Sequence, residues 1–439
     1  MVNAQTRDVR AALRRGCGMM DGATGAARNG RRADVIGTRR TTQSADLTDV
    51  RMTNLAVVLR YVRTHAPCSR ADIAASTGLN KATVSSLVSD LLERRLLRET
   101  GMAENRIGRP AAMLTLESRP YAAVGLEVAA DQITAVAVDI AGERLLSWRR
   151  AFPGLRAAPG RAEAAVAALA GRVVTKLTGD GHRVLGLTVG VPGLVGADGR
   201  VRFATHLGWS DLDLRAALLK TLRQPEYDVV VDNDANLAAL AEYRSGVGAG
   251  TPDLVCLLGG VGVGAGIIAD GRLVRGARGF AGQIGHLQLD PGGPLCRCGR
   301  RGCLEAFAGL PALVRRALPG DDDPVTDYAP ELERMIARAR SGDHIVLGTL
   351  KDAGRRLGQA VSVLADLVDP RVVVLGGAFA TLSPWLLPAA EAELSTRALP
   401  AGEAGTRIVV SKLEPGSAAA GGAALVLDRL EAGHLPVSA

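Results

Sequence analysis

The chain has 439 residues, of which 47% are apolar, so it is long enough for two or three domains with hydrophobic cores. No apolar run reaches the roughly 18 residues that a membrane-spanning helix needs. No charged-then-apolar segment with a cleavage site marks the chain for secretion.

The net charge of +8 is unevenly divided along the chain. Residues 1–120 carry 20 Lys and Arg against 11 Asp and Glu, a net of +9, whereas the remaining 319 residues carry 33 against 34, a net of −1. This asymmetry favours an amino-terminal part that faces nucleic acid and a neutral globular remainder. The alternative is a basic tail that serves only solubility.

Residues 1–48 are rich in Arg, Gly, Ala and Thr and have little apolar periodicity. We expect a disordered basic tail, although a start site assigned too early would give the same pattern.

Residues 50–118 are predicted to form a winged helix-turn-helix domain. Ser69 and Asn80 are N-cap residues for two helices, and Gly78 supplies the turn between them. Two apolar segments, 96–100 and 112–116, then flank a Gly- and Arg-containing loop and are predicted to be the strands of a wing.

The second helix of this domain has one apolar stripe and one polar face, and the polar face is typical of a recognition helix. We predict that Lys81 and its neighbours contact phosphates or base edges. Arg109 lies between Gly108 and Pro110, which suits entry into a narrow minor groove. The alternative is a solvated face on a domain that contacts only protein. The predicted DNA-binding residues are Lys81, Thr83, Ser85, Ser86, Arg106 and Arg109.

Residues 121–432 alternate apolar strands with helices, which indicates an α/β fold. The strands are predicted at 122–128, 133–140, 184–189, 229–231, 254–258 and 372–375, and an Ala-rich helix at 162–177. We expect two similar halves with a break near Ala239–Pro252.

Asn233 and Asp234 follow a predicted strand, and their amide and carboxylate suit hydrogen bonds to ligand hydroxyls. Taken alone, such an Asn-Asp turn is more often a helix cap. A glycine-rich turn at 262–266 and the segment Gly279–His286 have similar loop character.

His286, Cys296, Cys298 and Cys303 form a complete tetrahedral ligand set for zinc. Because a set of four protein ligands leaves no open position, the predicted zinc is structural. The alternative is chance clustering of buried thiols. Cys17, Cys68 and Cys256 are scattered and suggest no disulfide framework, so we expect a cytoplasmic protein.

Taken together, these motifs resemble the ROK family of repressors, open reading frames and kinases. The resemblance covers about residues 50–432 and rests on Gly190–Gly193, Asn233–Asn236 with Glu242, Gly279–His286 and Cys296–Glu305. It implies a two-lobed actin-like or hexokinase-like ATPase fold behind a winged helix-turn-helix, with the zinc loop at 286–303. It also implies that the following residues bind a sugar: Asn233, Asp234, Gln283, His286 and Glu305.

The sequence departs from the kinase pattern at the phosphate loops. Where kinases of the family have Asp-x-Gly-Gly-Thr, this chain has Glu127–Asp131, with Ala129 and Ala130 in place of the glycines. Val261 stands where kinases usually have Thr, and Gln283 where the family usually has Glu. Without glycine, a backbone approaches phosphates less closely, so we expect no ATP-dependent activity.

The resulting hypothesis is a sugar-responsive transcriptional regulator, most simply a repressor of carbohydrate-utilisation genes that a sugar releases from operator DNA. The resemblance also implies a homodimer or homotetramer. One alternative is an active, glucokinase-like sugar kinase with an appended DNA-binding domain. Another is a constitutive DNA-binding protein with a dead sugar site.

Overall fold

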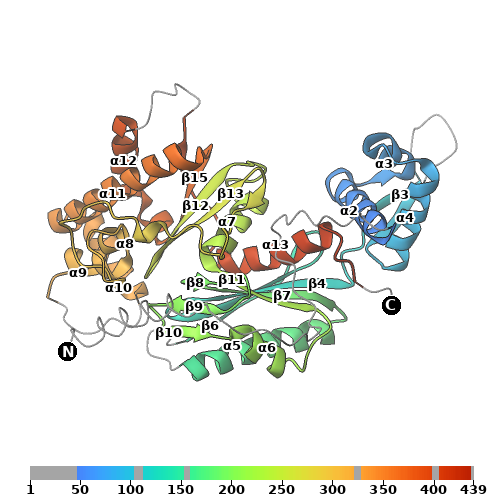
Figure 1. Ribbon diagram of the computed structural model, residues 1–439, viewed down its shortest axis with the longest axis horizontal. Coiled ribbons are helices and arrows are strands. Elements are labelled where there is room, and N and C mark those ends of the chain that lie inside the picture. Colours follow the sequence, from blue (N-terminus) through green and yellow to red (C-terminus); the bar gives the residue numbers. More distant parts are fainter. Residues whose placement is uncertain (1–46, 103–111, 153–158, 321–327, 398–404, 437–439) are drawn as a thin grey trace, which may run out of the picture.

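The computed structural model describes residues 47–102, 112–152, 159–320, 328–397 and 405–436. Residues 1–46 of the predicted tail and the predicted DNA-binding residues Arg106 and Arg109 lie outside these ranges. Figure 1 shows a small helical domain at one end and two larger lobes, each built on a β-sheet.

The small domain is a winged helix-turn-helix. The Ser69 hydroxyl accepts a hydrogen bond from the Asp72 amide, and the Asp72 carboxylate accepts one from the Ser69 amide. The Asn80 side chain caps the next helix by accepting a hydrogen bond from the Thr83 amide. Both predicted helix starts are therefore confirmed. Gly78 makes the turn between the helices with a φ of 72°. The elements are α2 (Leu47–His65), β1 (Cys68–Ser69), α3 (Arg70–Thr77), α4 (Lys81–Glu93), β2 (Leu97–Met102) and β3 (Ala112–Leu116).

The first lobe contains a five-stranded sheet in the order β11-β7-β4-β5-β6. Strands β11, β7 and β4 are parallel, and β5 and β6 continue the sheet antiparallel. Helix α5 packs against this sheet through a core of valine, leucine and alanine side chains. The elements are β4 (Tyr121–Val128), β5 (Gln132–Val138), β6 (Arg144–Ala151), α5 (Pro159–Gly179), β7 (Arg183–Val191), β8 (Leu194–Val195), β9 (Val201–Ala204), β10 (Trp209–Leu212), α6 (Leu214–Thr221) and β11 (Asp228–Asn233).

The second lobe contains another five-stranded sheet, in the order β14-β13-β12-β15-β16. Strands β12, β15 and β16 are parallel, and β13 pairs antiparallel with β12. The elements are β12 (Leu254–Gly259), β13 (Val263–Ala269), β14 (Arg272–Leu273), η1 (Ile284–His286), α8 (Glu305–Ala308), α9 (Leu310–Ala317), α10 (Ala329–Arg340), α11 (His344–Val368), β15 (Val372–Gly377), α12 (Ala378–Arg397) and β16 (Arg407–Val410).

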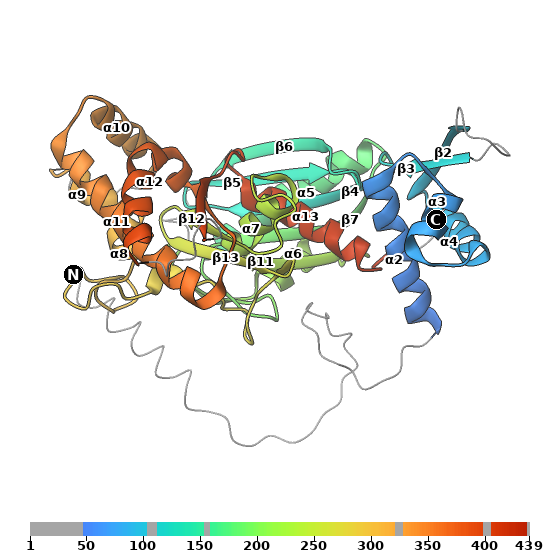
Figure 2. The ribbon, with the colours of Figure 1, turned by 90° about the horizontal axis from the view of Figure 1, so that it is seen from above.

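Two helices, α7 (Asp234–Ser245) and α13 (Ser417–Glu431), lie between the sheets. Figure 2 shows α13 running from this central position to the winged helix-turn-helix domain. The backbone of α13 lies very close to the backbones of β4 and α7. A Cβ added at Gly125 of β4 would lie 1.8 Å from the Ala419 carbonyl oxygen, and a Cβ added at Gly421 of α13 would lie 1.7 Å from the Leu237 carbonyl oxygen. Only glycine allows backbones to approach so closely.

The predicted break near Ala239–Pro252 is wrong in its first half. Helix α7 continues without interruption to Ser245, because its side chains are buried from Ala235 to Glu242 and the helix is held on both sides. The chain therefore crosses to the second lobe later, between Gly246 and Asp253.

Candidate functional site

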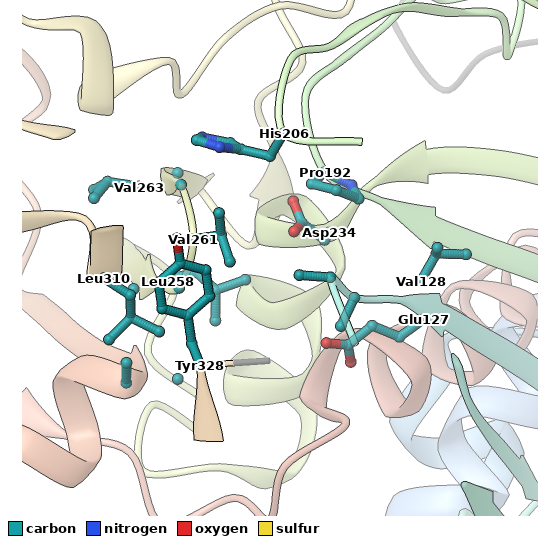
Figure 3. Close-up of a pocket in the computed structure, with 18 of the residues that line it drawn as sticks. Glu127, Val128, Pro192, His206, Asp234, Leu258, Val261, Val263, Leu310 and Tyr328 are labelled. Carbon is teal, nitrogen blue, oxygen red and sulfur yellow. The ribbon is translucent and has the colours of Figure 1, made fainter. Parts of the chain in front are cut away.

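A pocket of about 480 Å³ lies between the two lobes. In Figure 3, first-lobe residues such as Glu127 and Asp234 lie on one side, and second-lobe residues such as Val261 and Leu310 lie on the other. The structure brings all five residues predicted to bind a sugar to the wall of this pocket: Asn233, Asp234, Gln283, His286 and Glu305.

Asn233 and Asp234 occupy the junction between β11 and α7. The Asn233 side chain caps α7, since its Oδ1 accepts a hydrogen bond from the Asn236 amide at 3.1 Å. Its Nδ2 donates to the Gly193 carbonyl and to Asp234 Oδ1, both at 3.0 Å. The helix-cap interpretation is thus correct, and the same cap fixes the orientation of Asp234 in the pocket.

The Asp234 carboxylate is held mainly by backbone and amide donors. Its Oδ1 accepts hydrogen bonds from the Ala235 amide at 2.8 Å and from Asn233. Burial raises the pKa of Asp234 to about 6, although these hydrogen bonds oppose the shift. A carboxylate with this pKa is a strong hydrogen-bond acceptor for a ligand hydroxyl at neutral pH.

Glu305 begins α8 and reaches the pocket from the second lobe. Its Oε2 accepts a hydrogen bond from the Val263 amide at 3.1 Å, which fixes it over the turn between β12 and β13. Its Oε1 lies 3.3 Å from Nε2 of His206 in the first lobe. The pair therefore links the two lobes at the pocket wall.

Sequence reasoning missed His206 and the position of Glu127. His206 lies in the turn after β9 and belongs to no motif, so only its contact with Glu305 identifies it. Glu127 is the second-to-last residue of β4, and its Oε2 accepts hydrogen bonds from the Ala418 and Ala419 amides at 3.1 and 3.3 Å. Burial, and secondly the charge of Asp234, raise the pKa of Glu127 to about 7.

The candidate metal centre lies directly beside the pocket. The ligand atoms of His286, Cys296, Cys298 and Cys303 all lie within 4.8 Å of one another. Cys298 Sγ and Cys303 Sγ are 3.7 Å apart, as are His286 Nδ1 and Cys296 Sγ. With Zn–S near 2.3 Å and Zn–N near 2.0–2.1 Å, a tetrahedral site has edges of about 3.6–3.8 Å, so this donor set fits zinc.

His286 has two ring nitrogens with different surroundings. Because Nδ1 faces the cysteine cluster, Nε2 is the atom available to the pocket that His286 also lines. One imidazole can therefore serve a metal and a ligand together.

The exposed face of α4 carries most of the predicted DNA-binding residues. Lys81, Ser85 and Ser86 are exposed, and Thr83 is half-buried. The opposite face, with Val84, Leu87, Val88 and Leu91, is buried in the domain core. Ser86 additionally accepts a 3.4 Å hydrogen bond from Arg51 of α2, which partly occupies its hydroxyl.

Among the described helices, none combines the length and apolar character that crossing a membrane requires.

Comparison with known protein families gives two matches. Residues 123–429 match the model of the ROK family, and residues 53–101 match the IclR helix-turn-helix domain. The first of these covers well over half of the chain.

Individual relatives match along almost their whole length. The chain is 27% identical to the xylose repressor of Bacillus subtilis over 384 residues, covering 88% of this chain and 97% of the relative. It is 29% identical over 374 residues to the DNA-binding transcriptional dual regulator NagC of Escherichia coli, covering 84% of this chain and 91% of the relative.

Two solved structures show the same architecture. A ROK family transcriptional regulator, a homologue of the E. coli MLC protein, superposes with a TM-score of 0.75 at 25% identity, covering 88% of this chain and 98% of the other. A ROK family glucokinase from Streptomyces griseus, in complex with glucose and AMPPNP, gives a TM-score of 0.58 at 27% identity and covers 69% of this chain and 98% of the other.

Proposed function

The chain belongs to the ROK family, and from this membership we propose that it is a sugar-responsive transcriptional repressor. The observation that carries the proposal is the joint presence of a pocket lined by Asn233, Asp234, Gln283, His286 and Glu305 and a helix-turn-helix domain with an exposed polar helix. The matches to the xylose repressor and to the dual regulator NagC cover 88% and 84% of the chain and so include both parts, whereas the glucokinase covers only 69% of the chain.

In the proposed binding mode, a sugar lies between the lobes. Asp234 and Glu305 accept hydrogen bonds from its hydroxyls, Asn233 accepts one through Oδ1, and His286 contributes Nε2. Gln283 replaces a carboxylate with a neutral amide, so it contributes hydrogen bonds without charge. These contacts reach the ligand from both lobes, and their formation therefore favours a closed pocket.

We propose that zinc occupies the His286, Cys296, Cys298 and Cys303 site and has a structural role. When bound, it holds the loop from Cys296 to Cys303, which leads directly into Glu305. The sugar itself is bound by Glu305 and His286, which the metal-held loop keeps in position because they lie at its two ends.

The phosphate-binding region does not favour ATP. Ala129, Ala130 and Asp131 form the turn after β4 and line the pocket, so two methyl groups and a carboxylate lie where a kinase needs room and positive potential. The first amides of α13 are already bound by the Glu127 carboxylate. A helix amino terminus that holds a carboxylate is less available to a phosphate.

A sugar kinase remains the second candidate because a glucokinase shares the fold of the two lobes. A coupled assay for ADP release, with D-glucose, D-xylose and N-acetylglucosamine as acceptors, decides between the two. Turnover at a rate above that of the Asp234→Asn variant would establish the kinase.

The repressor proposal is tested by fluorescence anisotropy of the protein, as the proposed homodimer or homotetramer, on operator DNA from upstream of its own gene. The titration is run at fixed salt with and without each of these three sugars. We expect one sugar to weaken operator binding, and Asp234→Asn to abolish this response while operator affinity without sugar is unchanged. Operator binding that no sugar changes would contradict sugar control, and loss of both functions in Asp234→Asn would make Asp234 structural.

A further inference from the structure

Helices α7 and α13 both begin at the pocket and both end beside the winged helix-turn-helix domain. Asp234 is the first residue of α7, and Ser417, the first of α13, also lines the pocket. At the far end, Arg244 of α7 donates to both carboxylate oxygens of Glu431 of α13, at 3.4 and 3.2 Å. The two helices therefore share the wall of the pocket at one end and an ion pair at the other.

Glu431 also holds the DNA-binding domain. Its Oε1 lies 2.8 Å from Nε of Arg63 in α2, and its carbonyl oxygen accepts a 3.1 Å hydrogen bond from Arg60 of the same helix. The Glu431 side chain is 10% exposed, so its carboxylate is largely shielded from solvent, whereas the Arg63 side chain is 34% exposed. Glu431 of α13 thus contacts both α7 and the first helix of the DNA-binding domain, and Arg244 of α7 also pairs with Asp428 of α13.

Residues at the end of α13 and just after it also contact α4 and the residue that follows it. Leu430 is buried in the core of the winged helix-turn-helix domain together with Leu87 and Leu91 of α4. The Tyr121 hydroxyl donates to the carbonyl of Arg94, the residue that follows α4, and the Arg94 side chain donates to the Pro436 carbonyl. The residues that follow α13 therefore pack directly against the helix that we expect to read DNA.

Helix α13 is suited to move as a rigid body. Its first amides are bound by Glu127 at the pocket, and Gly125 and Gly421 leave no gap against β4 and α7. A shift of β4 or α7 when the pocket closes cannot be absorbed by these backbone contacts, so it displaces α13.

We propose that Glu431, bonded to Arg63 and Arg244, is the positioning residue through which the state of the sugar pocket reaches the DNA-binding domain. This inference rests on the proposed function, because it explains how one pocket would change operator affinity. Removing the Glu431 charge should uncouple the two sites and leave each of them able to bind.

The test measures coupling separately from binding. Operator affinity is measured by anisotropy with and without D-xylose, D-glucose or N-acetylglucosamine, and sugar affinity by calorimetry with and without operator. By linkage, both ratios give one coupling factor, which we expect to be about 5–150 in the wild type. In Glu431→Gln and in Arg63→Gln the coupling factor should fall below about 2. Operator affinity without sugar and sugar affinity without operator should each stay within about threefold of the wild-type value.

Two variants control for loss of structure. Arg63→Lys keeps the positive charge and should retain most of the coupling, and Glu391→Gln removes an exposed carboxylate of α12 and should retain all of it. If Glu431→Gln does not fold, Arg63→Gln alone decides the proposal. Full coupling in Arg63→Gln or Glu431→Gln would overturn the relay only, whereas a wild type that no sugar affects would overturn the repressor function and the relay together.

Discussion

Nε2 of His206 lies 3.3 Å from Oε1 of Glu305, and the two residues come from different lobes. His206 Nδ1 is buried and has no hydrogen-bond partner among the residues that the structure describes. A sugar hydroxyl that approaches Glu305 therefore meets a carboxylate already oriented by an imidazole from across the pocket.

His206→Ala should weaken sugar binding by about tenfold, because it removes a hydrogen bond to a charged group, worth roughly 1.5 kcal/mol or more. Calorimetry with the sugar identified in the operator titration measures the loss. Operator affinity without sugar should be unchanged, since His206 lies at the pocket. A sugar affinity equal to that of the wild type would show that the His206–Glu305 pair does not orient the ligand.

The candidate zinc site predicts a metal content and an effect on stability. Cys298→Ser should lower the bound zinc well below one ion per chain and reduce the melting temperature by several degrees, because the loop loses a ligand that fixes its conformation. Atomic absorption and thermal unfolding measure the two effects. Cys68→Ser removes a thiol in the DNA-binding domain and should keep the zinc. A wild type without zinc, or Cys298→Ser with unchanged zinc and melting, would contradict the assignment.

The raised pKa of Glu127 predicts a pH-dependent stability. Burial and the charge of Asp234 raise the pKa of Glu127 from its ordinary value of 4.5 to about 7. The Glu127 carboxyl therefore binds a proton more tightly in the folded state than in the unfolded state. Its contribution to stability is complete below pH 4.5 and is lost as the pH rises towards 7.

Glu127→Gln keeps an acceptor for the Ala418 and Ala419 amides but cannot ionise. Its free energy of unfolding should exceed that of the wild type increasingly between pH 5 and pH 8, by up to about 3 kcal/mol. Urea unfolding at several pH values measures this difference. A difference that does not change with pH would mean that Glu127 titrates normally.

Lys81 is exposed at the start of α4 and should contact a phosphate. Lys81→Ala should weaken binding to operator and non-operator DNA alike and reduce the slope of log affinity against log salt by about one. Anisotropy titrations at several salt concentrations measure the slope. Lys176→Ala, on α5 of the first lobe, is the matched control and should leave it unchanged. An unchanged slope in Lys81→Ala would exclude this phosphate contact.

The parts of the site that could be predicted are those encoded locally. The four candidate zinc ligands lie within 18 residues, and the caps at Ser69, Asn80 and Asn233 depend on neighbours three residues away. The alternation of strands and helices likewise indicated two α/β lobes.

The remaining features depend on residues far apart in the sequence. Glu127 and Ala418 are separated by 291 residues, and Arg60 and Glu431 by 371. No periodicity or spacing indicates such pairs, since only the packing of α13 between the sheets brings them together. His206 escaped notice for the same reason, because its partner Glu305 lies in the other lobe.

The burial of Leu430 among the side chains of the DNA-binding domain also has a consequence for synthesis. The helices α2, α3 and α4 leave the ribosome early and can form their own caps and turn at once. Their apolar face for α13 stays uncovered until both lobes have been translated, which takes on the order of half a minute at 5–20 residues per second. A nascent chain therefore exposes an incomplete DNA-binding domain during this interval, and a chaperone that covers apolar surface would find its binding site there.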